Sequence, residues 1–272
     1  MAHTGEQPPN PTGMRHKPES DAAPDHYSAV ARQYAAFRPA YPAVLFEWLT
    51  TLSPSCHLAW DCGTGSGQAA IGLAERFHRV HATDPSTAQL ERAPIHPRIT
   101  YRGGGEADSG LPDQSAALVT AAQAAHWFDL PAFYREADRV LTPDGILAIW
   151  SYGAPRTEPA IDRRLDWFRG ERVGSYWPPG REHVDDGYRH LPFPFPEIPA
   201  PAFSIEMRWS LAQLLGYVRS WSAVARCRQR EGRDPVDELA AAIAPDWGEP
   251  SVFRRITWEI ALRVGRKPDS VG

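Results

Sequence analysis

The residues best suited to chemistry in this chain are a carboxylate and three glycines that stand together near residue 60. Asp61 is followed by Gly63, Gly65 and Gly67 in the run DCGTGSGQAA. Because glycine has no Cβ atom, this spacing predicts a tight turn whose backbone a ligand can approach closely. The amides of such a turn, and of a helix that follows it, form a cradle for a polar ligand.

The acid before the glycines separates two classes of ligand. A dinucleotide-binding turn usually reads G-x-G-x-x-G and holds a pyrophosphate on helix-terminal amides. Here the run GTGSG, which includes Thr64, gives G-x-G-x-G, and the carboxylate of Asp61 would repel a pyrophosphate. The same carboxylate suits a ligand with an ammonium group, such as S-adenosylmethionine, which has no phosphate.

A second carboxylate, Asp84, ends the apolar run VHATD. It stands about 20 residues after the glycine turn, where a ligand with a ribose needs an acid for its two hydroxyls. Both nicotinamide dinucleotides and S-adenosylmethionine contain a ribose. Asp84 therefore supports a nucleoside-binding fold without choosing the cofactor, and the alternative role for it is a helix cap.

The turn from Asp61 to Gly67 resembles the first motif of the class I S-adenosylmethionine-dependent methyltransferases. The longer run GLPDQSAALVTAAQAAHWFDLPAFYREADRVLTPDG resembles a subgroup related to the trans-aconitate methyltransferases and the ubiquinone/menaquinone-type enzymes. This resemblance extends from about Tyr27 to Lys267. It implies S-adenosylmethionine as the cofactor, S-adenosylhomocysteine as the product and a small organic molecule as the methyl acceptor.

The resemblance also implies further cofactor contacts. In the family, an acid in the loop after the third strand meets the adenine amino group, and here Glu106 and Asp108 are both candidates, with Asp108 the first choice. Gln123 and Trp127 follow the fourth strand, and ligands lie at the carboxyl ends of parallel strands. Arg38 lies in AFRPAYP, a segment that the family folds over the cofactor. It is expected to hold either the cofactor's carboxylate or that of the acceptor.

His126 is the candidate catalytic residue. An unperturbed imidazole has a pKa of about 6.5, so a histidine beside the acceptor can take a proton at neutral pH. A phenol, amine or amide acceptor needs such a base, whereas a carboxylate is already deprotonated and needs only a cationic or hydrogen-bonding holder. The alternative is that His126 shapes the pocket beside Trp127 without moving protons.

Acceptor-binding residues are expected both early and late in the chain. Arg181 follows the WPPG turn, where it either grips both oxygens of a carboxylate or lies on the surface. Aromatic residues would form an apolar lid that excludes water, or they pack in the core. The candidates are Tyr34 and Tyr41 in QYAAFRPAYP, and Tyr176, Trp177, Tyr188 and Trp221 in the late segments.

An alternation of short strands and helices must position these residues. Strands are expected at residues 57–61, 79–84, 99–103, 116–123 and 146–152, and helices at 27–37, 43–52, 68–77, 86–93 and 130–141. After Gly153, helices are expected at 161–174, 210–229 and 235–247, with strands at 203–209 and 256–267. The alternation predicts an α/β fold with a doubly wound, mostly parallel seven-stranded sheet and late helical additions.

The composition limits the alternatives. The chain has 272 residues, a formal net charge of −4 and three cysteines, which argue against nucleic-acid binding, a metal site and a disulfide framework. No apolar run is long enough for a membrane span. We expect a disordered tail at residues 1–25 and one cytoplasmic domain at 26–272, monomeric or homodimeric. Segments 153–202 and 211–247 are expected to form lid or acceptor-binding additions.

The leading hypothesis is therefore methyl transfer from S-adenosylmethionine to a small organic acceptor, with carboxyl O-methylation as the first choice. O- or N-methylation of a secondary metabolite is the alternative within the same class. A nicotinamide-dependent oxidoreductase would share Asp84, but Asp61 and the compact glycine spacing argue against it. The third hypothesis is a fold relative that binds the cofactor without catalysis.

Overall fold

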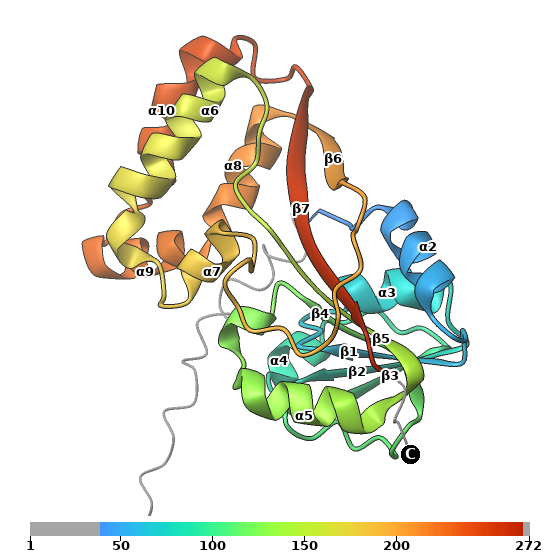
Figure 1. The fold of residues 1–272 in the computed structure, drawn as a ribbon. Helices are drawn as coiled ribbons and strands as arrows, with labels where there is room; N and C mark the ends of the chain where they lie inside the picture. Colours follow the sequence, from blue (N-terminus) through green and yellow to red (C-terminus); the bar gives the residue numbers. More distant parts are fainter. Residues whose placement is uncertain (1–38, 269–272) are drawn as a thin grey trace, which may run out of the picture.

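Seven strands form one sheet in the computed structural model, which describes residues 39–268 (Figure 1). In chain order they are β1 (Leu58–Cys62), β2 (Arg79–Asp84), β3 (Ile99–Gly103), β4 (Ala116–Ala122), β5 (Leu141–Tyr152), β6 (Phe203–Trp209) and β7 (Arg254–Arg266). Their order in the sheet is β3-β2-β1-β4-β5-β7-β6. Strands β1 to β5 are parallel, and β7 runs antiparallel to both of its neighbours. The predicted doubly wound, mostly parallel sheet is confirmed.

The direction of winding reverses between β1 and β4, which are neighbours in the sheet. The chain leaves β1 to build β2 and β3 on one side, and then returns to build β4 and β5 on the other. In doubly wound sheets, ligands bind at the carboxyl ends of the strands beside such a switch point. The glycine turn after β1 and the segment after β4 therefore meet at one edge of the sheet.

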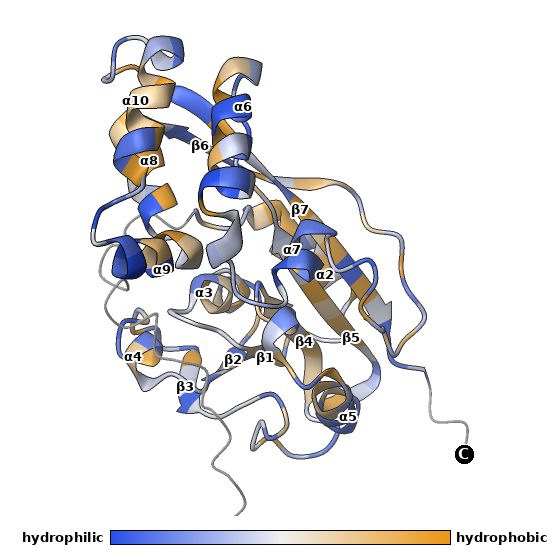
Figure 2. Cartoon of the chain, turned by 90° about the vertical axis from the view of Figure 1, so that its left-hand side faces the viewer, coloured by the Kyte–Doolittle hydropathy of each residue, from blue (hydrophilic) through white to orange (hydrophobic). Residues whose placement is uncertain are grey.

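Apolar side chains cover both faces of the sheet. The helices α2 (Ala43–Leu52) and α3 (Gln68–Ala74) share one core cluster with the sheet, and α5 (Leu130–Val140) packs in a second cluster with Trp60. Figure 2 shows hydrophobic colouring along β4, β5 and α5. Burial on both faces explains why the parallel strands read as continuous apolar runs. Two short elements, α4 (Thr87–Leu90) and η1 (Ala125–Trp127), follow β2 and β4.

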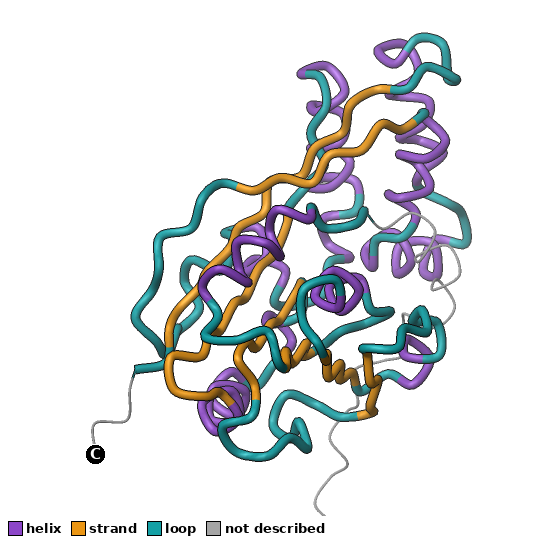
Figure 3. Tube along the Cα trace, turned by 90° about the vertical axis from the view of Figure 1, so that its right-hand side faces the viewer, coloured by secondary structure: helices purple, strands orange, loops and turns teal. Residues whose placement is uncertain are grey.

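The helices that follow β5 gather beyond one end of the sheet. They are α6 (Pro159–Trp167), η2 (Phe168–Arg172), η3 (Gly174–Tyr176), α7 (Arg181–Asp185), α8 (Leu211–Arg219), α9 (Ser222–Glu231) and α10 (Val236–Trp247). Figure 1 shows α6, α8, α9 and α10 together, and Figure 3 shows two long strands running out of the sheet beside the helices. The guanidinium of Arg172 joins three elements, because it donates to Glu231 in α9 and to Glu238 in α10. The role of this helical addition as a lid stays a prediction.

One predicted helix is wrong because the structure interrupts it. Residues 210–229 form α8 and α9 rather than one helix, because the backbone of Trp221 is extended between them. This break places the ring of Trp221 with its centre 5.6 Å from that of Trp177. The helix predicted at 161–174 is present: α6 passes directly into the π-helical turn η2, and helical backbone ends at Arg172.

Some predictions fall outside the described residues. They are the disordered tail at 1–25, the helix at 27–37 and the candidate site residues Tyr34 and Arg38. Among the helices of residues 39–268, none combines the length and the apolar character that crossing a membrane requires.

Candidate functional site

The glycine turn after β1 takes a conformation that side chains would block. Gly63, Gly65 and Gly67 all have positive φ, at 68°, 56° and 85°. A Cβ atom on Gly63 would lie 2.6 Å from the Cβ of Ala124, and one on Gly67 would lie 2.5 Å from the hydroxyl of Tyr101. Gly65 differs, because its nearest neighbour would be 4.0 Å away. The predicted tight turn is therefore present, with open space above its central glycine.

Asp84 holds this turn from the end of β2. One oxygen of its carboxylate accepts the backbone N–H of Gly65 at 2.8 Å, and the other accepts that of Ser86 at 2.9 Å. Burial raises the pKa of Asp84, while these two hydrogen bonds lower it. A carboxylate oxygen has capacity for a second hydrogen bond, so Asp84 remains suited to ribose hydroxyls. The open space at Gly65 and this acid together fit the nucleoside of S-adenosylmethionine.

Asp61 lies beneath the turn and is completely buried. Its two carboxylate oxygens accept the hydroxyls of Thr64 at 2.6 Å and Thr120 at 2.8 Å. Burial raises the pKa of Asp61 to about 6, although both hydroxyls lower it. The acid therefore fixes Thr64 and joins β1 to β4. The attraction of Asp61 for the ammonium group of a ligand stays a prediction.

The two candidate acids after β3 lie in different surroundings. Glu106 accepts the backbone N–H of Asp129 at 2.9 Å. Burial raises the pKa of Cys62 at the end of β1, and the charge of Glu106 adds to this rise, so Glu106 lies near that strand end. Asp108 is exposed, and its carboxylate lies 3.6 Å from Arg102 of β3. Glu106 is thus the acid tied to the start of α5, in the segment that follows β4. The sequence pattern had favoured Asp108.

The segment after β4 is held in an unusual conformation. Gln123 has a φ of 55°, and its amide Nε2 donates to the carbonyl of Tyr152 at 3.0 Å. Its Oε1 is buried and accepts no hydrogen bond from residues 39–268. A non-glycine residue in the left-handed region is held there by its surroundings and occurs often at functional sites. Gln123 therefore presents a fixed acceptor at the edge where a ligand is expected.

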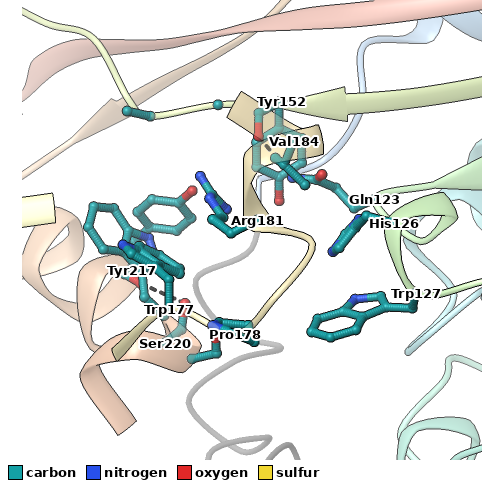
Figure 4. Close-up of a pocket in the computed structure, with 14 residues that line it drawn as sticks. Gln123, His126, Trp127, Tyr152, Trp177, Pro178, Arg181, Val184, Tyr217 and Ser220 are labelled. Atoms are coloured by element: carbon teal, nitrogen blue, oxygen red, sulfur yellow. Dashed lines mark hydrogen bonds between the residues drawn. The ribbon is translucent and has the colours of Figure 1, made fainter. Parts of the chain in front are cut away.

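A pocket that is partly open to solvent lies beside this segment (Figure 4). It brings together the residues after β4, the end of β5 and the helical addition. Fourteen described residues line it: Gln123, His126, Trp127, Tyr152, Gly153, Ala154, Trp177, Pro178, Arg181, Val184, Tyr217, Ser220, Trp221 and Ser222. Six of the predicted site residues therefore meet here: Gln123, His126, Trp127, Trp177, Arg181 and Trp221.

Arg181 forms part of the pocket wall with two tryptophans. Its guanidinium carbon lies 4.5 Å from the ring centre of Trp177, which in turn packs near Trp221. Its Nε donates to Asp185 at 2.9 Å. Burial lowers the pKa of Arg181, while Asp185 raises it. The side chain is only 20% exposed, so the alternative of a surface arginine is wrong.

Three predicted acceptor residues do not line the pocket. Tyr188 is fully buried, and its hydroxyl lies 2.7 Å from Nδ1 of His126. Tyr176 donates to Glu231 at 3.0 Å within the helical addition. Tyr41 packs edge-on against Trp150 of β5. These three support the site through packing and hydrogen bonds instead of lining it.

Sequence reasoning missed Tyr152, Tyr217, Ser220 and Ser222, which all line the pocket. Tyr152 is the last residue of β5, so the rule that ligands lie at carboxyl ends of strands could have found it. The other three surround the break between α8 and α9. Their position depends on a break that the sequence pattern did not predict.

Comparison with known proteins places the chain among methyltransferases. The family model described as a methyltransferase domain matches residues 60–149. A protein of Dictyostelium discoideum named as a methyltransferase is 34% identical over 219 residues, which is 79% of this chain and 83% of the relative. An uncharacterized methyltransferase of Mycobacterium tuberculosis is 33% identical over 174 residues, 62% of this chain and 65% of the relative.

A solved structure supports the same assignment. It comes from Anaeromyxobacter dehalogenans, is named as a type II methyltransferase and is 48% identical in sequence. It covers 86% of this chain and 99% of its own, with a TM-score of 0.81. The narrower subgroup related to the trans-aconitate methyltransferases stays a prediction. With this identity over most of both chains, and a doubly wound sheet that carries the glycine turn, the chain belongs to the class I S-adenosylmethionine-dependent methyltransferases.

Proposed function

We propose that the methyl acceptor is the carboxylate of a small organic molecule, and that the product is its methyl ester. The observation that carries this proposal is an unbalanced positive charge on the wall of the pocket. Arg181 is the only lining residue, among those described, that carries a permanent charge. The part of the lining that the structure describes contains no Asp or Glu to neutralise this charge.

The carboxylate nearest to Arg181 is shared. Asp185 binds Arg181 through Nε and also forms an ion pair with Arg169. Two guanidinium groups with one carboxylate between them leave one positive charge in excess. In a partly buried site this charge favours an anionic ligand, and the planar guanidinium fits the two oxygens of a carboxylate.

The other walls of the pocket suit the body of an organic acid. Trp127, Tyr152, Trp177, Tyr217 and Trp221 supply aromatic surface around the polar groups. Aromatic side chains together with a few fixed polar groups are typical of small-molecule sites. A protein or nucleic-acid acceptor would instead need an open surface.

S-adenosylmethionine, when bound, supplies a methyl group on a sulfonium that is already activated for displacement. The residues of this chain then have to hold the acceptor and exclude water. Gly65, Asp84 and Glu106 would hold the cofactor, and Arg181 would bind the acceptor carboxylate. Orientation of two reactants alone can account for roughly 7–11 kcal/mol of the barrier. A carboxylate loses no proton in this reaction, so no base is required.

The proposal is tested by the stability of the product bond. The protein is incubated with methyl-labelled S-adenosylmethionine and a panel of carboxylic acids, phenols and amines. Label that appears only with carboxylic acids, and is released as methanol by mild alkali, would support ester formation. Label that resists alkali, or that appears with phenols or amines, would establish the alternative of ether or N-methylation. No transfer to any of these acceptors would count against a small carboxylate as the acceptor.

Arginine variants test the assigned contact. Arg181→Gln is expected to lower kcat/KM for the carboxylic acid about 10- to 100-fold, since a hydrogen bond to a charged group contributes about 1.5–3 kcal/mol. Binding of S-adenosylhomocysteine should stay within about two-fold, because Arg181 is not assigned to the cofactor. Arg189→Gln is the matched control: Arg189 is an exposed arginine of the same segment, donates only to the backbone of Asp186 among described residues, and lies outside the pocket lining.

A further inference from the structure

A buried hydroxyl lies behind His126, which is the one histidine among the described residues of the pocket lining. The Tyr188 hydroxyl lies 2.7 Å from Nδ1 of His126, and Tyr188 has no solvent exposure. Figure 4 shows the His126 ring projecting into the pocket beside Trp127 and across from Arg181. The nitrogen bound by the tyrosine is therefore on the protein side of the ring, and Nε2 is on the pocket side.

The backbone holds Tyr188 in this position. Its φ is 62°, directly after Gly187 at 67°, so the chain is turned tightly here. The backbone carbonyl of Tyr188 accepts a hydrogen bond from Nη1 of Arg263 at 2.9 Å. Arg263 also donates through Nη2 to the carboxylate of Glu197. A fully buried ring with an anchored backbone has little freedom to move its hydroxyl away from His126.

The direction of the hydrogen bond follows from counting protons. Burial raises the pKa of Tyr188, so its hydroxyl keeps its single proton. Within residues 39–268, Nδ1 of His126 is the only acceptor that a hydrogen bond joins to this hydroxyl. A buried hydroxyl that failed to donate would cost about 1–3 kcal/mol. Tyr188 therefore donates to Nδ1, which must then carry no proton.

We propose that Tyr188 is a positioning residue that locks His126 in the tautomer with its proton on Nε2, so that His126 donates a hydrogen bond in the pocket and is not a general base. In a neutral imidazole one nitrogen is a donor and the other an acceptor, so fixing Nδ1 as the acceptor fixes Nε2 as the donor. This proposal rests on the proposed function in one respect: the Nε2–H group of His126 is assigned to a methyl acceptor that is a carboxylate and therefore already an anion. Together with Arg181, it would give the carboxylate a second donor.

The first test measures the tautomer directly and needs no acceptor. The full chain is labelled with ¹⁵N at its histidine rings, saturated with S-adenosylhomocysteine and studied by NMR near pH 7.5. The His126 signals are assigned from their loss in His126→Gln. A one-bond proton coupling at Nε2, with Nδ1 unprotonated, is the expected result. Protons on Nδ1, on both nitrogens or in a mixture of the two tautomers would overturn the proposal.

The second test removes only the donor hydroxyl. In Tyr188→Phe the signal of Nδ1-protonated ring is expected to appear, because nothing then fixes Nδ1 as an acceptor. An unchanged His126 spectrum in this variant would overturn the role of Tyr188. Tyr134→Phe is the matched control, since Tyr134 also loses a buried hydroxyl bond, at 2.6 Å to the carbonyl of Pro192, but does not contact His126. If Tyr188→Phe fails to fold, the wild-type spectrum still decides the tautomer.

The third test separates a donor from a base. The amide nitrogen of glutamine reaches the position of Nε2, whereas that of asparagine mimics Nδ1. Once an acceptor is known, His126→Gln should lower kcat/KM by about ten-fold or less and keep the pH profile, because removing a base usually costs about 10²–10⁴-fold. A loss in that larger range would overturn the donor role. Failure to find a carboxylate acceptor would instead contradict only the proposed function, since the NMR result does not depend on it.

Discussion

Asp84 accepts the backbone N–H of Gly65 at 2.8 Å, so the last residue of β2 fixes the turn that follows β1. The same carboxylate accepts the backbone N–H of Ser86, and it also lies where the cofactor ribose is expected. One acid thus shapes the cradle and remains available to the ligand. This double role makes Asp84 a direct test of the cofactor site.

Substitution of Asp84 should weaken cofactor binding strongly while the protein still folds. We expect Asp84→Ala to raise the Kd for S-adenosylhomocysteine about 100-fold, because hydrogen bonds to a charged acceptor are lost from both the ligand and the turn. Isothermal titration calorimetry measures this change. Asp113→Ala is the control, because Asp113 is exposed, pairs with Arg139 and precedes β4 at the opposite edge of the sheet. Equal affinities in both variants would contradict the assignment of Asp84.

A Cβ atom at Gly67 should damage the turn through both space and conformation. Gly67→Ala would meet the Tyr101 hydroxyl at 2.5 Å, and alanine disfavours the φ of 85°. We expect a loss of about 1–3 kcal/mol in the free energy of unfolding, measured by urea denaturation. Adding Tyr101→Phe should restore part of it, because the shortest contact is then removed, while two ring carbons at 3.3 Å and the φ remain. Gly170→Ala, which has open space around it, should change little.

Asp61 makes stability depend on pH in a defined window. Its pKa rises from 3.8 unfolded to about 6 when buried, so the native state binds more protons than the unfolded state between these values. The free energy of unfolding therefore falls as pH rises through this window, by roughly 3 kcal/mol at full effect. Asp61→Asn lacks this dependence. Its Tm relative to wild type should rise between pH 4 and pH 7.

The control for Asp61 is Asp138→Asn, since Asp138 is largely exposed. Its Tm difference from wild type should stay nearly constant across the same range. A pH-independent difference for Asp61→Asn as well would show that the buried carboxylate is not the group that titrates.

The two acids after β3 can be separated by binding. We expect Glu106→Gln to weaken S-adenosylhomocysteine binding about ten-fold, because Glu106 is fixed to the backbone of Asp129 near the ends of β1 and β4. Asp108→Asn should have less than a two-fold effect, because Asp108 points to Arg102. Fluorescence titration of both variants would decide between them. A larger effect of Asp108→Asn than of Glu106→Gln would instead favour Asp108, the first choice made from the sequence.

The sequence by itself determined the sheet and the edge of the sheet at which the cofactor is expected. Local signals suffice there: apolar runs specify buried parallel strands, a glycine turn requires positive φ, and Asp84 ends its strand at a fixed distance along the chain. These features depend on neighbours in sequence, so their spacing can be read directly. The sequence did not decide whether Glu106 or Asp108 meets the adenine, because the spacing of residues in a loop does not reveal which way a side chain points.

The pocket was decided only by the tertiary structure. His126, Arg181 and Trp221 come from segments far apart in the chain, and they meet because β7 pairs with both β5 and β6 while α8 and α9 break at Trp221. Such contacts depend on packing between elements, which no local pattern encodes. The same holds for Tyr188: the sequence marked it as a residue of the acceptor site, whereas the structure buries it with its hydroxyl 2.7 Å from Nδ1 of His126.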